Sequence, residues 1–158
     1  MSVEVLIGNI ASGKSTYCKQ RVQEGALVVN DDAIVNVVHC NDYTLYDVKL
    51  KPLYKAVENQ IVMSAITLGR DVLIDRGLNL TPKSRRRWIG LAHSMDVDCR
   101  CVLFKFEEPV VHANRRKQHD LRGHTYAYWL EVAEKFNNKY VPPTIKEGFD
   151  KIINHEHN

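Results

Sequence analysis

One segment near the start of the chain has the pattern G-x-x-x-x-G-K-[ST], which is typical of loops that hold the phosphates of a nucleoside triphosphate. Its two glycines let the backbone approach the phosphates without an intervening Cβ atom, so that backbone N–H groups can point at the anion. Lys14 would neutralise the β- and γ-phosphates, and the Ser15 hydroxyl would bind Mg²⁺. We therefore expect ATP or another nucleoside triphosphate to bind with Mg²⁺ at Gly8, Asn9, Ala11, Ser12, Gly13, Lys14, Ser15 and Thr16.

Three aspartates stand at the ends of apolar runs and supply candidate carboxylates. Asp31 and Asp32 directly follow a run that ends at Asn30, and Asp75 ends another. A carboxylate beside a bound triphosphate can remove the proton of an attacking hydroxyl, and we expect Asp31 or Asp32 to do so. Both could instead begin a helix, where carboxylates stabilise the first turn. Asp75 has the position of a Walker B carboxylate, which with Ser15 predicts a Mg²⁺ site; its alternative role is a turn or a helix cap.

Four cations gather in the run Lys83-Ser84-Arg85-Arg86-Arg87, in the first turn of a predicted helix. Cations at this end oppose the helix dipole, and a bound anion would remove the conflict. Arg85 stands three residues before Trp88, hence near the predicted buried stripe, while its neighbours lean outward. The alternative is a solvated basic face.

A second cationic segment, residues 115–123, is polar and lies between two predicted helices. A flexible lid that carries arginines could close over the triphosphate, exclude water and stabilise the transition state. An ordinary basic surface loop is the alternative.

The elements that must position these residues alternate along the chain. Strands are predicted over residues 3–7, 26–30, 71–75, 97–106 and 149–153, and helices over 15–24 and 47–68, from 81–82, from about 109, and from Trp129 to Tyr140. This order predicts an α/β fold of three layers, with a parallel sheet of about five strands and helices on both faces. Ligands of such sheets bind beyond the carboxyl ends of the strands, where the loop and the three aspartates fall.

Length and composition add bounds. The 158 residues are 44% hydrophobic and 26% charged, which fits one domain covering residues 1–158. A net charge of +3 is too small to indicate nucleic-acid binding by itself. The chain has no signal peptide or membrane-length apolar run and no C-x-x-C pair, so we expect a soluble, cytoplasmic protein whose cysteines are reduced. The tail, residues 155–158, carries two histidines, and we expect a solvated terminus rather than a metal site.

Taken together, these segments resemble the P-loop polynucleotide 5′-kinases, a family that phosphorylates the 5′-hydroxyl ends of DNA or RNA. The likeness runs from Val3 to about Phe149, and its motifs are the loop 8–15, Asn30-Asp31-Asp32, the segment 75–81 and Arg85-Arg86. It implies the P-loop kinase fold with an arginine-bearing lid, ATP and Mg²⁺ as the ligands, and a 5′-hydroxyl DNA or RNA end as the partner.

The resemblance also implies roles for single residues. Asp31 would be the general base, Arg115 would bind the nucleotide, and Lys14, Arg116 and Arg122 would act on the transferred phosphate. The acceptor would be bound by Asp32, Asn79, Arg85 and Arg86.

The sequence departs from the family at two places. The family commonly has an arginine three residues after the catalytic aspartate, where it contacts a phosphate of the acceptor; this chain has Ile34. The arginine spacing of the lid is also irregular, because Asp120 and Leu121 precede Arg122. A nucleoside, another small alcohol or a hydroxymethylated DNA base therefore stays open as the acceptor, and a nucleotide-dependent switch that transfers nothing is the competing class.

Overall fold

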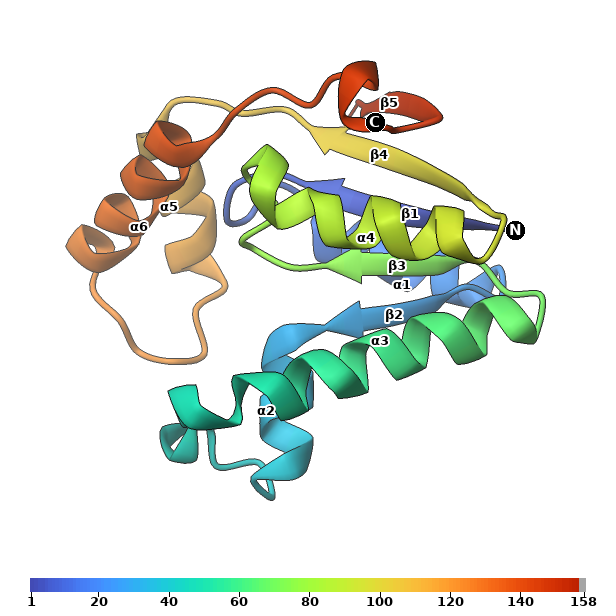
Figure 1. Ribbon diagram of the computed structural model, residues 1–158. Helices are drawn as coiled ribbons and strands as arrows, with labels where there is room; N and C mark the ends of the chain where they lie inside the picture. The colour runs from blue at the N-terminus through green and yellow to red at the C-terminus, as the bar shows by residue number, and fades with distance from the viewer. Residues whose placement is uncertain (157–158) are drawn as a thin grey trace.

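A computed structural model, which describes residues 1–156, has a parallel sheet at its centre (Figure 1). Its strands are β1 (Ser2–Ile7), β2 (Leu27–Asn30), β3 (Val72–Asp75), β4 (Asp98–Phe104) and β5 (Lys151–His155). They lie in the order β2-β3-β1-β4-β5, and every neighbouring pair is parallel. The predicted sheet of about five parallel strands is confirmed.

Helices alternate with the strands as the sequence predicts. They are α1 (Lys14–Gln23), α2 (Asp31–Val38), α3 (Lys51–Thr67), α4 (Pro82–Ser94), α5 (Pro109–Gln118) and α6 (Tyr126–Lys139). Three short 3-10 turns, η1 (Tyr43–Leu45), η2 (Val48–Leu50) and η3 (Ile145–Glu147), complete the regular elements of the described residues.

The two faces of the sheet bury different residues because side chains alternate along a strand. On one face Val3, Val5 and Ile7 of β1 pack with apolar residues of α3 and α4. On the other face Leu6 packs with Phe104 of β4 and with residues of α1. Helices thus cover both faces, which gives the predicted three layers (Figure 1).

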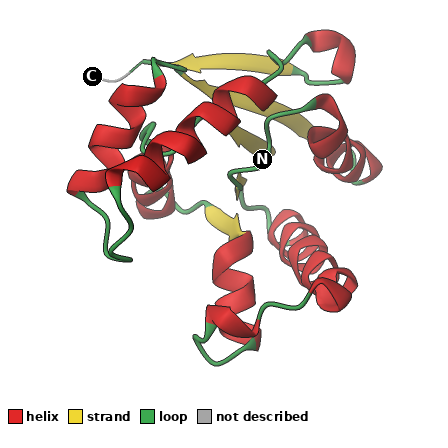
Figure 2. Ribbon diagram, turned by 90° about the vertical axis from the view of Figure 1, so that its left-hand side faces the viewer, coloured by secondary structure: helices red, strands yellow, loops and turns green. Residues whose placement is uncertain are grey.

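The helices α5 and α6 and the segment 119–125 between them form a hairpin, here termed the lid. The lid lies at the carboxyl ends of the strands, and its two helices pass in front of those ends in Figure 2. Arg115 and Arg116 belong to the last turn of α5, and only Arg122 lies in the connecting segment. The loop predicted over 115–123 is therefore shorter than expected.

Asp120 gives the connecting segment a defined shape. Its carboxylate accepts hydrogen bonds from the backbone N–H groups of Arg122 (2.8 Å) and His124 (2.7 Å) and from the indole of Trp129 (2.9 Å). Each of these bonds removes freedom from the segment that carries Arg122. The residue that interrupts the arginine spacing thus holds the lid loop in place.

Three- and four-residue spacing predicts a buried stripe on α3 that includes Leu53, Ala65 and Leu68, and the buried face differs from it. Leu53 and Leu68 are exposed, whereas Glu58, Val62 and Ile66 are buried. The helix also begins at Lys51 instead of residue 47, after the turn η2. The buried face includes the charged residue Glu58 because arginines from other elements pair with it.

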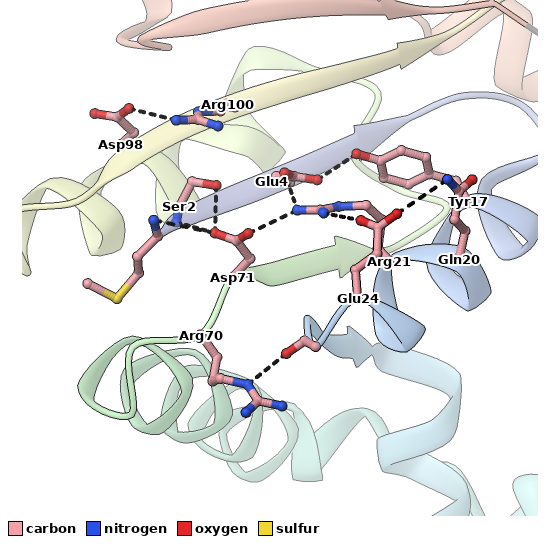
Figure 3. Close-up of polar contacts among 12 residues, drawn as sticks. Ser2, Glu4, Tyr17, Gln20, Arg21, Glu24, Arg70, Asp71, Asp98 and Arg100 are labelled. Carbon is pink, nitrogen blue, oxygen red and sulfur yellow. Dashed lines mark hydrogen bonds and ion pairs between the residues drawn. The ribbon is translucent and has the colours of Figure 1, made fainter.

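The amino-terminal half of the sheet holds a charged network on the α1 side (Figure 3). Arg21 donates to Glu4 (3.1 Å) and to Asp71 (2.9 Å), and the Tyr17 hydroxyl donates to Glu4 (2.7 Å). A buried carboxylate that is fully paired stabilises the packing of α1 on the sheet. This network joins α1 to β1 and to Asp71, the residue before β3.

The remaining expectations concern the cysteines, the tail and the membrane. All four cysteines are free; Cys40 is exposed and the other three are buried. His155 packs its ring against Phe104 and Tyr17 instead of lying free in solvent, while His157 and Asn158 lie outside the described residues. Within residues 1–156, no helix has the length and apolar character that crossing a membrane requires.

Candidate active site

The segment from Gly8 to Ser15 joins β1 to α1, so the strand, loop and helix of the predicted motif are present. Gly13 caps the helix with a φ of 98°, a left-handed conformation that glycine adopts without strain. Gly8 is required for a different reason: a Cβ atom there would lie 2.8 Å from Cβ of Phe104. The loop is held between the sheet and α1 at a helix N-terminus, where free N–H groups favour an anion.

Lys14 lies inside this loop. Its ammonium donates to the carbonyls of Gly8 (2.9 Å) and Asn9 (2.6 Å) and to Ser12 Oγ (3.3 Å). Burial lowers the pKa of Lys14 to about 8, although the nearby Asp75 carboxylate acts in the opposite direction. A bound triphosphate would place further negative charge beside the ammonium and favour its protonated form.

A cavity of about 530 Å³ adjoins the loop. Arg115, Arg116 and His119 of the lid line it together with the loop residues 11–16 and Lys19. Arg116 is held by the ring of Trp129, 4.7 Å from its guanidinium carbon, and Arg115 lies 3.6 Å from Glu107. The structure therefore brings two of the three predicted lid arginines to the phosphate loop. Lys19 and His119 also line this cavity, although the sequence motif does not identify them.

Ser15 and Asp75 are the candidate magnesium ligands. Asp75 ends β3, the strand beside β1, and Asn30 Nδ2 lies 3.3 Å from its carboxylate. One hydroxyl and one carboxylate fit Mg²⁺, which usually keeps several waters and takes further oxygens from phosphates. In residues 1–156 no group of three or more His, Cys, Asp or Glu side chains could hold a metal ion.

A second cavity, of about 270 Å³, contains both candidate bases. Asp31 and Asp32 form the first turn of α2, so the helix-start alternative is correct, and both still line the cavity. Asp31 Oδ2 accepts from Arg76 Nε at 3.3 Å. Burial raises the pKa of Asp31 above its usual range, and Arg76 only partly offsets this effect. A carboxylate with a raised pKa is a stronger proton acceptor, as a general base requires.

Arg76 is a residue that the sequence reading missed. It follows the Walker B aspartate directly, which is the only local signal for it. Its Nε lies 3.6 Å from Glu58, which is 2% exposed and is also bound by Arg87 at 2.5 Å. Arg76 thus lies between two carboxylates, Asp31 and Glu58, and links α3 to the cavity.

Arg122 connects the lid to this second cavity. Its guanidinium lies 3.7 Å from Asp32 Oδ2, and both side chains are about half exposed. An exposed pair at this distance is weak, so a phosphate could replace the carboxylate as the partner of Arg122. Of the predicted lid arginines, this one reaches the side of the site where the acceptor is expected.

Two of the residues predicted to bind the acceptor, Arg85 and Asn79, have fully buried side chains that make hydrogen bonds within the fold. Arg85 donates twice to Glu147, at 2.8 and 2.9 Å, and once to the carbonyl of Val141 at 3.1 Å. The amide of Asn79 donates to the carbonyls of Leu6 (3.2 Å) and Ile74 (3.1 Å), which holds its loop to the sheet. The bonds that these two side chains donate hold parts of the fold together, whereas the buried Asn79 Oδ1 has no hydrogen-bond partner among the described residues. Their acceptor-binding roles remain predictions.

The prediction for Asn9 needs a narrower form. Its buried amide donates to the carbonyl of Ala133 (2.9 Å) and to Asn137 (2.7 Å), so the side chain fastens the loop to α6 of the lid. Because the Asn9 carbonyl accepts from Lys14 (2.6 Å), the backbone N–H is the group of Asn9 that could face a phosphate. Arg86 is exposed on the turn beside Arg85 but lines neither cavity, and its acceptor role remains a prediction.

Comparison with known proteins adds family evidence. A family model described as AAA domain matches residues 3–143. The bifunctional polynucleotide phosphatase/kinase of Schizosaccharomyces pombe is 29% identical over 154 residues, which cover 95% of this chain and 32% of that protein. The chain therefore spans about a third of the length of this curated relative.

Solved structures share the fold at lower identity. A chain of the Pnkp1/Rnl/Hen1 RNA repair complex has a TM-score of 0.66 and 18% identity, over 94% of this chain and 46% of that one. A gluconokinase from Sinorhizobium meliloti 1021 has a TM-score of 0.61 and 16% identity, over 97% of this chain and 81% of that one. The sheet and helices have the P-loop kinase fold, which this chain shares with the gluconokinase and with a chain of the RNA repair complex.

Proposed function

Because the chain belongs to the AAA domain family and has a P-loop kinase fold, we propose that it is an ATP-dependent kinase that phosphorylates the 5′-hydroxyl of a nucleic acid. The observation that carries this proposal is the second cavity. It holds two carboxylates, one with a raised pKa, at the carboxyl end of β2, on the same edge of the sheet as the triphosphate loop that follows β1. The 29% identity to a polynucleotide phosphatase/kinase supports the choice of acceptor.

In the proposed reaction the terminal 5′ oxygen attacks the γ-phosphorus of ATP. Asp31 accepts the hydroxyl proton, the bond between the γ-phosphorus and the β,γ-bridging oxygen breaks, and ADP leaves. Lys14 and the lid residues Arg116 and Arg122 stabilise the charge on the transferred group. Arg115 contacts the nucleotide.

Mg²⁺, held by Ser15 and Asp75, would neutralise phosphate charge. Backbone N–H groups of the loop 8–15 would bind the phosphates of the nucleotide. Asp32 would help to orient the acceptor. We further propose that residues 1–158 act as one kinase domain in a reducing compartment such as the cytoplasm, which suits four free cysteines.

The experiment offers γ-labelled ATP and Mg²⁺ with 5′-hydroxyl oligonucleotides, free nucleosides, gluconate and base-hydroxymethylated DNA, and maps the labelled atom. We expect label on the 5′ oxygen of oligonucleotides. Label on another acceptor alone would replace the proposed substrate, and ATP turnover at an unchanged rate with no labelled acceptor would identify a nucleotide-dependent switch.

Two variants test the roles within the site. Asp31→Asn should lower transfer by about 10²- to 10⁴-fold and leave the affinity for ATP intact, while Lys14→Ala should remove transfer. Asp98→Asn removes an equal charge from an exposed position at the start of β4 and should change neither. If Asp32→Asn alone abolishes transfer, then Asp32 is the base.

A further inference from the structure

The lid is joined to the phosphate loop by two side-chain amides. Asn9 of the loop is fully buried, and its Nδ2 donates to Asn137 Oδ1 at 2.7 Å and to the carbonyl of Ala133 at 2.9 Å. Both acceptors belong to α6, 128 and 124 residues further along the chain. Asn9 Oδ1 accepts from the N–H of Ile10 at 2.6 Å. Both polar atoms of the Asn9 side chain therefore have partners, as a buried amide requires.

Asn137 continues this connection to the place where the lid leaves the sheet. Its Nδ2 donates to the carbonyl of Glu107 at 2.9 Å, and the N–H of Glu107 donates to His112 Nε2 at 3.0 Å. His112 is fully buried on α5, and burial lowers its pKa, so the ring is neutral and its Nε2 can accept. Each helix of the lid thus binds one backbone group of Glu107. These bonds join residues 107–113 to residues 133–137, and the two segments are here termed the root of the lid.

The root of the lid also determines where two arginines of the nucleotide cavity lie. Arg115 and Arg116 follow His112 by three and four residues, so they lie one turn further along the same face of α5. The guanidinium of Arg115 is 3.6 Å from the carboxylate of Glu107. A helix that is bound at His112 and at Glu107 has little freedom to carry these guanidiniums away from the phosphate loop.

We propose that Asn137 is a positioning residue of the kinase, which fixes the phosphate loop through Asn9 and the root of the lid through Glu107. Arg115 and Arg116 are then in place before ATP binds, and only the connecting segment 119–125 moves when the lid closes. The inference rests on the proposed function and specifies how its nucleotide half is organised. The sequence motif does not contain this contact, because G-x-x-x-x-G-K-[ST] leaves position 9 unspecified and Asn137 lies far outside it.

The variant Asn137→Ala tests the positioning role by kinetics. It leaves one donor bond of Asn9 and the carbonyl of Glu107 without their partner, so the loop and the lid root lose their fixed relation. We expect kcat to fall about 10- to 100-fold and the KM for ATP to rise, while the KM for the oligonucleotide stays unchanged. Asn138→Ala removes the same side chain from the adjacent, exposed position of α6 and should change none of these values. Unchanged kcat in Asn137→Ala would overturn the inference.

A second background separates positioning from a general loss of stability. In a protein that carries Arg115→Ala and Arg116→Ala, these arginines are no longer there to be positioned. Adding Asn137→Ala should then lower kcat by no more than about twofold. A further 10- to 100-fold loss in that background would overturn the inference, because Asn137 would then act independently of the two arginines.

Hydrogen exchange of the unmodified protein tests the same point without any variant. Mg²⁺ with a non-hydrolysable ATP analogue should slow amide exchange in the connecting segment 119–125 and leave exchange in the root of the lid unchanged. A clear slowing in the root would show that ATP orders it, and would overturn the inference. Failure of the unmodified protein to phosphorylate any oligonucleotide would instead overturn the proposed function, and the exchange experiment would still test the role of the root.

Discussion

Replacing Arg85 by Met should destabilise the protein without a specific effect on acceptor binding. The guanidinium is fully buried and donates to both carboxylate oxygens of Glu147, at 2.8 and 2.9 Å, and to the carbonyl of Val141 at 3.1 Å. These bonds tie α4 to the segment before β5. Methionine fills much of the same volume but leaves the Glu147 side chain, which is 12% exposed, without its cation and with the N–H of Thr144 (2.8 Å) as its remaining donor among the described residues, and it leaves the Val141 carbonyl without the Arg85 donor.

The size of the loss follows from that geometry. Removing one partner of a buried ion pair costs about 3–5 kcal/mol, because the other charge stays desolvated. Domains of this size lose roughly 2–4 °C of Tm for each kcal/mol, so the Tm should fall by about 6–20 °C. Removing both charges, as Arg85→Met with Glu147→Met, should be less harmful than Arg85→Met alone.

The assay is thermal unfolding followed by circular dichroism, with ATP and oligonucleotide affinities measured well below the transition. Arg86→Ala is the control, because Arg86 is exposed on the same turn; its Tm should change by less than about 2 °C. An Arg85→Met protein with an unchanged Tm and a selective loss of oligonucleotide affinity would refute the structural role and restore Arg85 to the acceptor site.

The remaining predictions concern ionisation and the loop. Arg76→Ala should raise the pKa of Asp31 further, because Arg76 lowers it, so the acidic limb of the kcat/KM profile should move to higher pH; an unmoved limb would exclude Asp31 as the base. The affinity for Mg·ATP should fall as the pH rises through about 8, where Lys14 loses its proton, and Lys14→Arg should abolish this dependence, since arginine stays charged. Gly8→Ala should cost about 1–3 kcal/mol of stability, because its Cβ would lie 2.8 Å from Phe104 Cβ; an unchanged free energy of unfolding would contradict the observed packing.

Local sequence determined the parts of this protein that depend on neighbouring residues. The phosphate loop is set by eight consecutive residues, and its strand and helix follow directly. Thr81 and Pro82 begin α4 as predicted, with the Thr81 hydroxyl accepting from the N–H of Ser84. Asp31 and Asp75 lie at the same edge of the sheet because parallel strands end together, which the alternation of strands and helices already indicates.

Only the tertiary structure decided which charged and aromatic side chains form the site. Arg85 and Arg86 are adjacent, yet one is buried against Glu147, 62 residues away, and the other is exposed. Arg76, in the loop after β3, pairs with Glu58 of α3. The rings of Tyr43, Tyr46 and Tyr54 stack where the turns η1 and η2 fold against α3. A periodic pattern predicts which face of its own helix a residue occupies. It does not predict which charged residue of another element will face that residue. Pairing with such a charge decides whether an arginine or a glutamate can be buried.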